Sequence, residues 1–315
     1  MPGSIDVTVT AAPLLLGGHP SVSTADGWTI SYDRFLITLN AQLGDDSTCA
    51  SYYNDGYRRI LDLGIAGPQK LNLLYALGHC DFGFRVSSTD PSPFLPLGQG
   101  VTAADVGLME TGEVDPYTTD RNGHPQPTGV ALYAKGRATK GGVTKTFAWA
   151  FRQGVSYQHC AAPRAAGDAG VRDSGIAPGI EDAGIYFADA GPTGREGVDL
   201  VGGGATTIDI RMHGESLFLD STNLITGTLR FDVLARADDE YGNRDGDIAL
   251  SELGQVSLTD IGLHGRYVEL KSDVDEGAPG ASPWTTLEDF VYKGLFPKVA
   301  RFEDKGTCVA RWRGR

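Results

Sequence analysis

Positive charge and long apolar runs are both scarce in this sequence. Its 315 residues carry 27 Lys and Arg against 40 Asp and Glu, which gives a formal net charge of −13. Nucleic acids and anionic lipid surfaces are bound through clustered cations, so the charge balance argues against both as main partners. No apolar run approaches the roughly 20 residues that a membrane-spanning helix needs, and no transmembrane segment is predicted.

Signatures of catalysis are also missing. The chain has no P-loop, no G-x-S-x-G elbow and no H-E-x-x-H or H-x-x-x-H pair among its six histidines. Residues 77–80 and 173–175 resemble the histidine and serine segments of trypsin-like proteases. However, Arg172 and Ile176 replace the glycines that such enzymes need to form the oxyanion hole. We therefore predict that the protein is not an enzyme.

Cysteine is rare, and its spacing points to disulfides. The four cysteines are dispersed without a C-x-x-C pair, which argues against zinc or redox motifs and for an exported protein with two disulfides. Of the three possible pairings we favour Cys49–Cys80, which closes a short loop, and Cys160–Cys308, which ties the C-terminus to the middle. Free buried thiols are the alternative.

The first residues contain no signal peptide or lipoprotein leader. Residues 1–4 are interpreted as a start methionine with added residues before a mature region that begins near Ile5. The expected location is extracytoplasmic, in the periplasm, at the cell surface or secreted, and a lipid anchor before the mature region stays open.

Apolar and polar residues alternate with period two along the chain, whereas long helical periodicity is absent. Clear strands are expected at 5–9, 28–43, 57–63, 71–77, 82–86 and 206–212, with others at 216–219, 228–235 and 267–270. A hairpin is expected at 130–139 and 143–151, and a change of phase after Arg34 predicts a β-bulge or two strands. The pattern predicts an all-β fold, an antiparallel β-sandwich with a few short helices and long loop insertions.

The chain is expected to consist of two halves of one sandwich with an insertion between them. Residues 5–160 form its first half, and residues 205–315 form its second half with an EF-hand-like loop and a C-terminal helix. Between them, residues 161–204 repeat Asp-Ala-Gly, have few large apolar side chains and indicate a flexible acidic insertion. Capping boxes at 102–105 and 285–288 predict two short helices, the second extending to about Phe296.

The strongest local motif resembles a calcium-binding EF-hand loop. Such a loop has oxygen ligands at positions three and five, glycine at six, a backbone carbonyl ligand at seven and a bidentate carboxylate at twelve. Gly246 falls on position six. The residues at positions three, five, seven and twelve are Asn243, Asp245, Asp247 and Glu252.

One position departs from the EF-hand pattern. Tyr241 stands at position one, where an aspartate is usual, and Asp239 or Glu240 would replace it only in a reshaped loop. Flanking helices are not evident from the sequence. We expect a stabilising calcium ion here, with a metal-free relic of such a loop as the alternative.

Several segments resemble a group of exported proteins and lipoproteins common in myxobacteria. They are residues 26–37, 57–63, 80–86, 141–149 and 306–308. Their order is also distantly similar to the MbnP-like copper-binding proteins, which are β-sandwich partners of a di-haem enzyme in methanobactin systems. That resemblance implies copper bound by histidines and a tryptophan-derived kynurenine, for which Trp149 is the candidate precursor.

His213 is the candidate copper ligand, because it lies beside a predicted strand next to Met212, and imidazole and thioether ligands suit copper. No second histidine is assigned. The leading function is therefore extracytoplasmic binding, most specifically metal handling. The alternative is a calcium-stabilised surface interaction, adhesion or carbohydrate-binding module with a protein or glycan partner.

Overall fold

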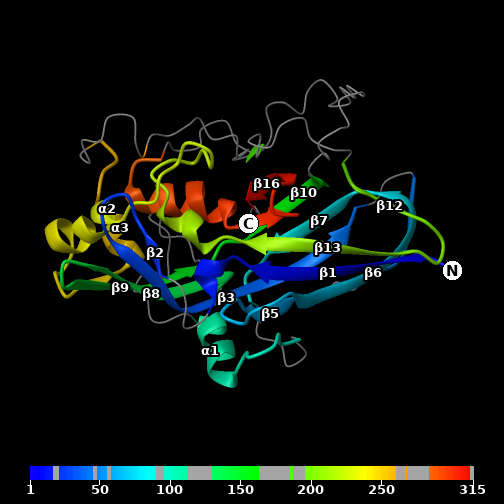
Figure 1. The fold of residues 1–315 in the computed structure, drawn as a ribbon, viewed down its shortest axis with the longest axis horizontal. Coiled ribbons are helices and arrows are strands. Elements are labelled where there is room, and N and C mark those ends of the chain that lie inside the picture. The colour runs from blue at the N-terminus through cyan, green and yellow to red at the C-terminus, as the bar shows by residue number, and fades with distance from the viewer. Residues whose placement is uncertain are drawn as a thin grey trace.

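Two β-sheets that share one hydrophobic core make up most of the protein (Figure 1). The computed structural model describes residues 1–16, 21–44, 48–54, 58–89, 96–111, 129–162, 185–186, 196–259, 267 and 284–312. Alternating side chains of the strands, such as Ile5 and Val7 in one sheet and Phe35 and Phe84 in the other, are fully buried between the sheets. The predicted all-β sandwich is confirmed.

The smaller sheet has β1 at its centre. Its strands run in the order β12 (Val198–Leu200), β6 (Gln69–Cys80), β1 (Gly3–Ala11), β13 (Ala205–Met212) and β15 (Ala300–Phe302), and β4 (Cys49–Asn54) also pairs with β6. β1 is antiparallel to β6 but parallel to β13, so this sheet is mixed and not purely antiparallel as expected. Parallel pairing needs a long connection, which the chain between the two strands supplies.

The larger sheet contains the predicted hairpin. Its order is β11 (Ile185–Tyr186), β16 (Thr307–Trp312), β10 (Val155–Ala161), β7 (Phe82–Val86), β3 (Thr29–Leu43), β8 (Leu132–Lys140), β9 (Val143–Phe151) and β14 (Asp247–Ile248), while β2 (Val22–Ser23) and β5 (Arg59–Asp62) pair with β3. The β8–β9 turn uses Gly141 and Gly142 at φ of 56° and 85°, which favours glycine. β3 is a single strand with a register shift between Tyr32 and Arg34, so the bulge interpretation holds.

The helical segments are short. They are α1 (Ala103–Thr111), α2 (Asp232–Arg236), α3 (Leu250–Leu253), α4 (Leu287–Asp289), the 3-10 turns η1 (Pro13–Leu15), η2 (Gly214–Phe218) and η5 (Phe296–Lys298), and the π-helical turns η3 (Ala237–Tyr241) and η4 (Phe290–Leu295). The Thr102 hydroxyl caps α1 by accepting a hydrogen bond from the Asp105 N–H, as predicted. The cap of α4 is Thr286 and not Thr285, with Asp289 as its partner.

Two predicted strands are wrong. Residues 216–219 lie largely in η2, where the N–H groups of Ser216 and Leu219 donate to the carbonyls three residues earlier, and these local bonds of a 3-10 turn replace strand pairing. Residues 228–235 lead into α2 instead, because the carboxylate of Asp26 accepts hydrogen bonds from the N–H groups of Phe231 and Asp232, both at 2.8 Å. The strand predicted at 267–270 lies outside the described residues except for Tyr267.

Each sheet contains strands that come before residues 161–204 in the sequence and strands that come after them. β1 pairs with β13, and β10 pairs with β16, so the two predicted halves build one sandwich. Most of residues 161–204 lies outside the described residues. Within that range, β11 joins the larger sheet and β12 joins the smaller one. Residues 3 and 4, interpreted as preceding the mature region, belong to β1.

Both predicted disulfides are confirmed. Cys49–Cys80 joins β4 to β6, and Cys160–Cys308 joins β10 to β16. Among the residues that the structure describes, no helix is long and apolar enough to cross a membrane.

A histidine lies next to the second disulfide in a left-handed backbone conformation. His159 has a φ of 51°, and its Nδ1 is 3.4 Å from Asp81 Oδ2 and 4.0 Å from Glu196 Oε2. The hydrogen bond with Asp81 raises the pKa of His159, burial lowers it, Glu196 raises it and Arg311 lowers it, with a net upward shift. The protonated imidazole therefore stabilises the folded state.

We predict that stability depends on pH through His159. Because the folded pKa is raised, this stabilisation is complete below the unfolded pKa of about 6.5 and is lost as the pH rises through the folded value. The change is below about 1 kcal/mol because the partly exposed pair is screened by solvent. Urea unfolding at a series of pH values measures it. His159→Asn, which tolerates the left-handed backbone, should remove this pH dependence; an unchanged slope in the variant contradicts the assignment.

Candidate functional site

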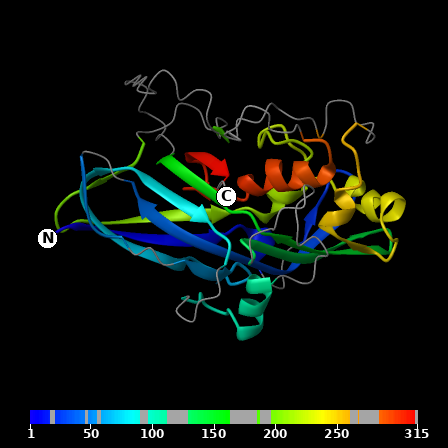
Figure 2. The ribbon, with the colours of Figure 1, turned by 180° about the vertical axis from the view of Figure 1, so that it is seen from behind.

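The predicted calcium-type loop lies between two helical segments. α2 and η3 lead into it and α3 follows it, so the loop has helical flanks that were not evident from the sequence. The two α-helices have only five and four residues, too short to give a helical periodicity in the sequence. This helix–loop–helix unit lies at one end of the long axis, beside the β8–β9 hairpin, and the N-terminus lies at the opposite end (Figures 1 and 2).

The exit of the loop is a short strand that joins the larger sheet. β14 pairs in parallel with β9, with Asp247 opposite Thr146 and Ile248 opposite Phe147. The Thr146 hydroxyl donates a hydrogen bond to Asp247 Oδ1 at 2.8 Å, and the Trp149 indole N–H donates to the Ile248 carbonyl at 2.8 Å. Positions seven and eight are thereby fixed to the sheet.

Side-chain oxygens at positions three and five organise the turn. Asn243 Oδ1 accepts a hydrogen bond from the Asp245 N–H at 3.0 Å, and Asp245 Oδ1 accepts one from the Asp247 N–H at 2.8 Å. These Asx-type contacts curl the backbone around its polar side chains. Gly246, at position six, has a φ of 88°, a conformation that favours glycine.

The glutamate at position twelve closes the base of the loop. Glu252 is buried, and its two carboxylate oxygens accept hydrogen bonds from the N–H groups of Asn243 and Ala249, both at 3.1 Å. A Cβ atom on Gly242 would overlap Glu252 Oε1, so glycine is required for this approach. Glu252 therefore joins positions three and nine of the loop.

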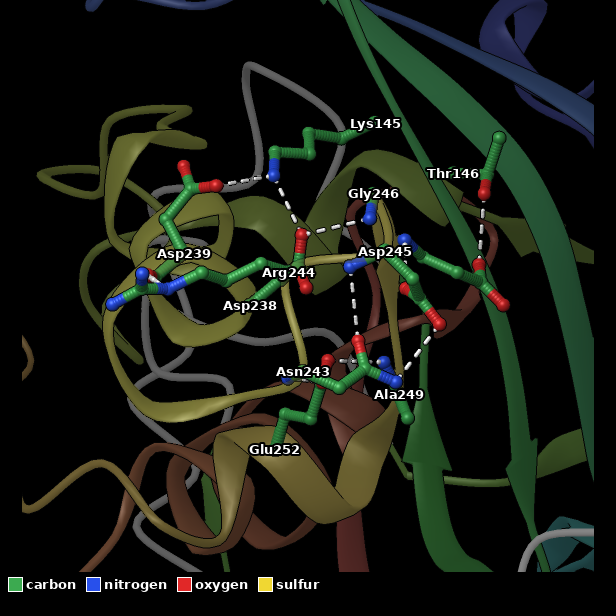
Figure 3. Close-up of polar contacts among 11 residues, drawn as sticks. Lys145, Thr146, Asp238, Asp239, Asn243, Arg244, Asp245, Gly246, Ala249 and Glu252 are labelled. Atoms are coloured by element: carbon green, nitrogen blue, oxygen red, sulfur yellow. Dashed lines mark hydrogen bonds and ion pairs between the residues drawn. The ribbon is translucent and has the colours of Figure 1, made fainter.

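An aspartate outside the twelve-residue frame faces the loop. Asp238 in η3 is fully buried, and its Oδ2 accepts hydrogen bonds from the Gly246 N–H at 3.0 Å and from Lys145 Nζ at 2.6 Å (Figure 3). Its Oδ1 is also buried and has no hydrogen-bond partner among the described residues. Of the other two acidic residues of η3, Asp239 binds the same ammonium group of Lys145 and Glu240 binds Arg236.

Asp238 and Lys145 were not identified from the sequence as site residues. Asp238 is three residues ahead of position one, and the π-helical turn brings it to the loop. Lys145 is 93 residues away from it on β9, and no sequence pattern links the two. From the sequence, Asp239 or Glu240 was offered as a replacement for Tyr241 at position one; in the structure it is the carboxylate of Asp238 that reaches the loop, at the Gly246 N–H.

The arrangement offers oxygen atoms to a hard cation. Four residues labelled in Figure 3 bring carboxylate or amide oxygens to the turn. Asp238 comes from η3, Asn243 and Asp245 from the loop, and Glu252 from α3. In the described part of the chain, no three His, Cys, Asp or Glu side chains are already grouped as metal ligands. The oxygens of Asn243, Asp245 and Glu252 instead accept hydrogen bonds from the backbone.

The predicted copper ligand lies between two carboxylates. His213 Nδ1 is 2.7 Å from Glu215 Oε1, and its Nε2 is 2.9 Å from Asp304 Oδ1. Both ring nitrogens are thus engaged, and a metal would have to displace one of these contacts. Copper binding by His213 stays a prediction.

Trp149 lies in the aromatic core. Its side chain is fully buried and its ring centroid is 5.0 Å from that of Phe147 and 5.7 Å from that of Phe218. Its indole nitrogen binds the loop at Ile248, as described above. Conversion of Trp149 to kynurenine stays a prediction.

No protein-family model matches the chain, and no curated protein or solved structure matches it either. The resemblance to the myxobacterial and MbnP-like proteins therefore stays a prediction as well.

We predict that Gly242→Ala lowers the free energy of unfolding by about 1–3 kcal/mol, because the added methyl group displaces the buried Glu252 carboxylate from its two N–H donors. Gly107→Ala is the matched control. It has open space around its Cα and lies inside α1, where alanine favours the helix. Denaturant unfolding compares the two, and equal effects would show that Glu252 does not hold the loop.

Proposed function

We propose that the protein is an extracytoplasmic binding protein whose loop between η3 and α3 binds a calcium ion. The buried Oδ1 of Asp238, which no described donor satisfies, is the observation that carries the proposal. A buried carboxylate oxygen without a partner is costly, and a cation would compensate it. The same loop carries the carboxylate and amide oxygens of Asn243, Asp245 and Glu252, which are the kinds of ligand that calcium prefers.

The charge of the surrounding segment supports a divalent ion. Between residues 236 and 252, carboxylates outnumber cationic side chains. The carboxylates of Asp245 and Asp247 are exposed, and each has one oxygen that faces the turn or its neighbouring strand. Asp245 Oδ1 accepts a hydrogen bond from the Asp247 N–H and its Oδ2 accepts one from Asn243 Nδ2, both at 2.8 Å, so a cation bound by Asp245 would replace at least one of these contacts.

The two disulfides support an oxidising, extracytoplasmic location. Calcium-binding modules outside the cell work at Kd values of about 10⁻⁴–10⁻³ M, and a loop that keeps its shape through its own hydrogen bonds suits this range. Because β14 is paired with β9, calcium bound here would stabilise the end of the β8–β9 hairpin. The ion has a structural role in this proposal, and no catalytic role.

We predict that calcium binds with one-to-one stoichiometry and that Asp245→Ala weakens it by about tenfold or more, because a charged ligand is removed. Isothermal titration calorimetry on chelator-treated protein measures binding. Glu240→Gln is the control, since it removes a nearby negative charge from a side chain that pairs with Arg236 and not with the loop.

Trp149 provides a second readout, because its indole N–H binds the Ile248 carbonyl at position eight. Calcium should change the fluorescence emission of Trp149 in the wild type and in Glu240→Gln. This change should occur over the same calcium concentrations at which calorimetry detects binding. No binding at 10⁻² M calcium, about tenfold above the weakest extracellular sites, would contradict the proposal. Equal losses in Asp245→Ala and Glu240→Gln would show only diffuse attraction to the acidic surface.

A further inference from the structure

An internal cation already lies beside the proposed calcium loop. Lys145 extends from β9, its side chain is only 7% exposed, and its Nζ is 2.6 Å from both Asp238 Oδ2 and Asp239 Oδ1 (Figure 3). Its ammonium group is therefore paired with two carboxylates, which favour the charged form of the lysine.

The two oxygens of the Asp238 carboxylate have different surroundings. Its Oδ2 binds the ammonium group of Lys145 and the N–H of Gly246, while its Oδ1 has no described partner. A metal ion bound through Oδ1 would lie across one carboxylate from the ammonium group. The two positive charges would repel each other, and in this buried position water would screen them weakly.

The lysine also supports the loop when no metal is bound. It neutralises a fully buried carboxylate, which would otherwise be a strongly destabilising isolated charge. By holding Asp238 against Gly246, it keeps the turn at position six in shape. A single side chain thus stabilises the loop and opposes a second cation.

We infer that Lys145 is a tethered counter-cation that tunes the loop: it weakens calcium binding and lets the loop keep its fold without calcium. This inference rests on the calcium site proposed above. It predicts that the charge of Lys145, more than its packing, sets both the affinity and the calcium dependence of stability.

The test replaces Lys145 with methionine, which is one atom shorter, keeps the unbranched apolar stem and removes the charge, and with arginine, which keeps the charge. Lys145→Met should bind calcium about tenfold or more tightly than wild type, because the repulsion is gone. Its melting temperature should fall in chelator and recover in calcium, whereas wild type and Lys145→Arg should gain less stability from the same calcium concentration because they bind it more weakly. Calorimetry and thermal unfolding measure the two effects.

Each outcome decides between the two proposals. Wild-type binding with equal or weaker binding by Lys145→Met overturns the inference and leaves the calcium site intact. Binding by Lys145→Met alone supports the inference that the lysine charge opposes calcium, and it overturns the proposal that the wild-type protein binds calcium. No binding by either overturns both. If Lys145→Met does not fold in chelator, refolding in calcium supports the inference, and failure to refold by it and by Lys145→Gln overturns it.

Discussion

The buried ion pair between Lys145 and Asp238 is the contact on which the helix–loop–helix unit depends. It joins the second arm of the β8–β9 hairpin to η3, two elements from distant parts of the chain. Burying two charges costs free energy, and this cost is offset only when further hydrogen bonds satisfy both groups. Gly246 supplies one for Asp238, and Asp239 supplies one for Lys145. Together with the pairing of β14 and β9, this ion pair fixes the loop to the sheet.

Much of the sandwich was predictable because a half-buried strand shows alternating apolar and polar residues over a short stretch of sequence. A strand with one buried face alternates along its length, as β1 and the β8–β9 hairpin do. The disulfide pairing was also predictable, because one pair closes a short loop and the other pair then follows. α2 was missed for a physical reason: the carboxylate of Asp26, 205 residues ahead of Phe231, holds its first turn. No window of the sequence contains both residues.

The candidate site was predictable only where its chemistry is local. The turn at Gly246 and the base formed by Glu252 both lie within the twelve-residue frame, and their roles follow from spacing. Asp238 enters the site through a π-helical turn, which shifts the register of the backbone and cannot be counted from residue spacing. His213 was singled out as an isolated histidine. Its two carboxylate partners come from residue 215 and residue 304, and the second is known only from the fold.

The position of β1 has a consequence for how the chain reaches its native state. This first strand is central in its sheet, between β6 and β13, and its pairing with β13 joins residues about 200 positions apart. A chain that emerges N-terminus first therefore carries one edge of β1 unpaired until the whole middle of the protein has been made. Closing contacts of such long range is slow, and open strand edges in the interval favour aggregation. The sandwich is completed late, after nearly all of the chain is available.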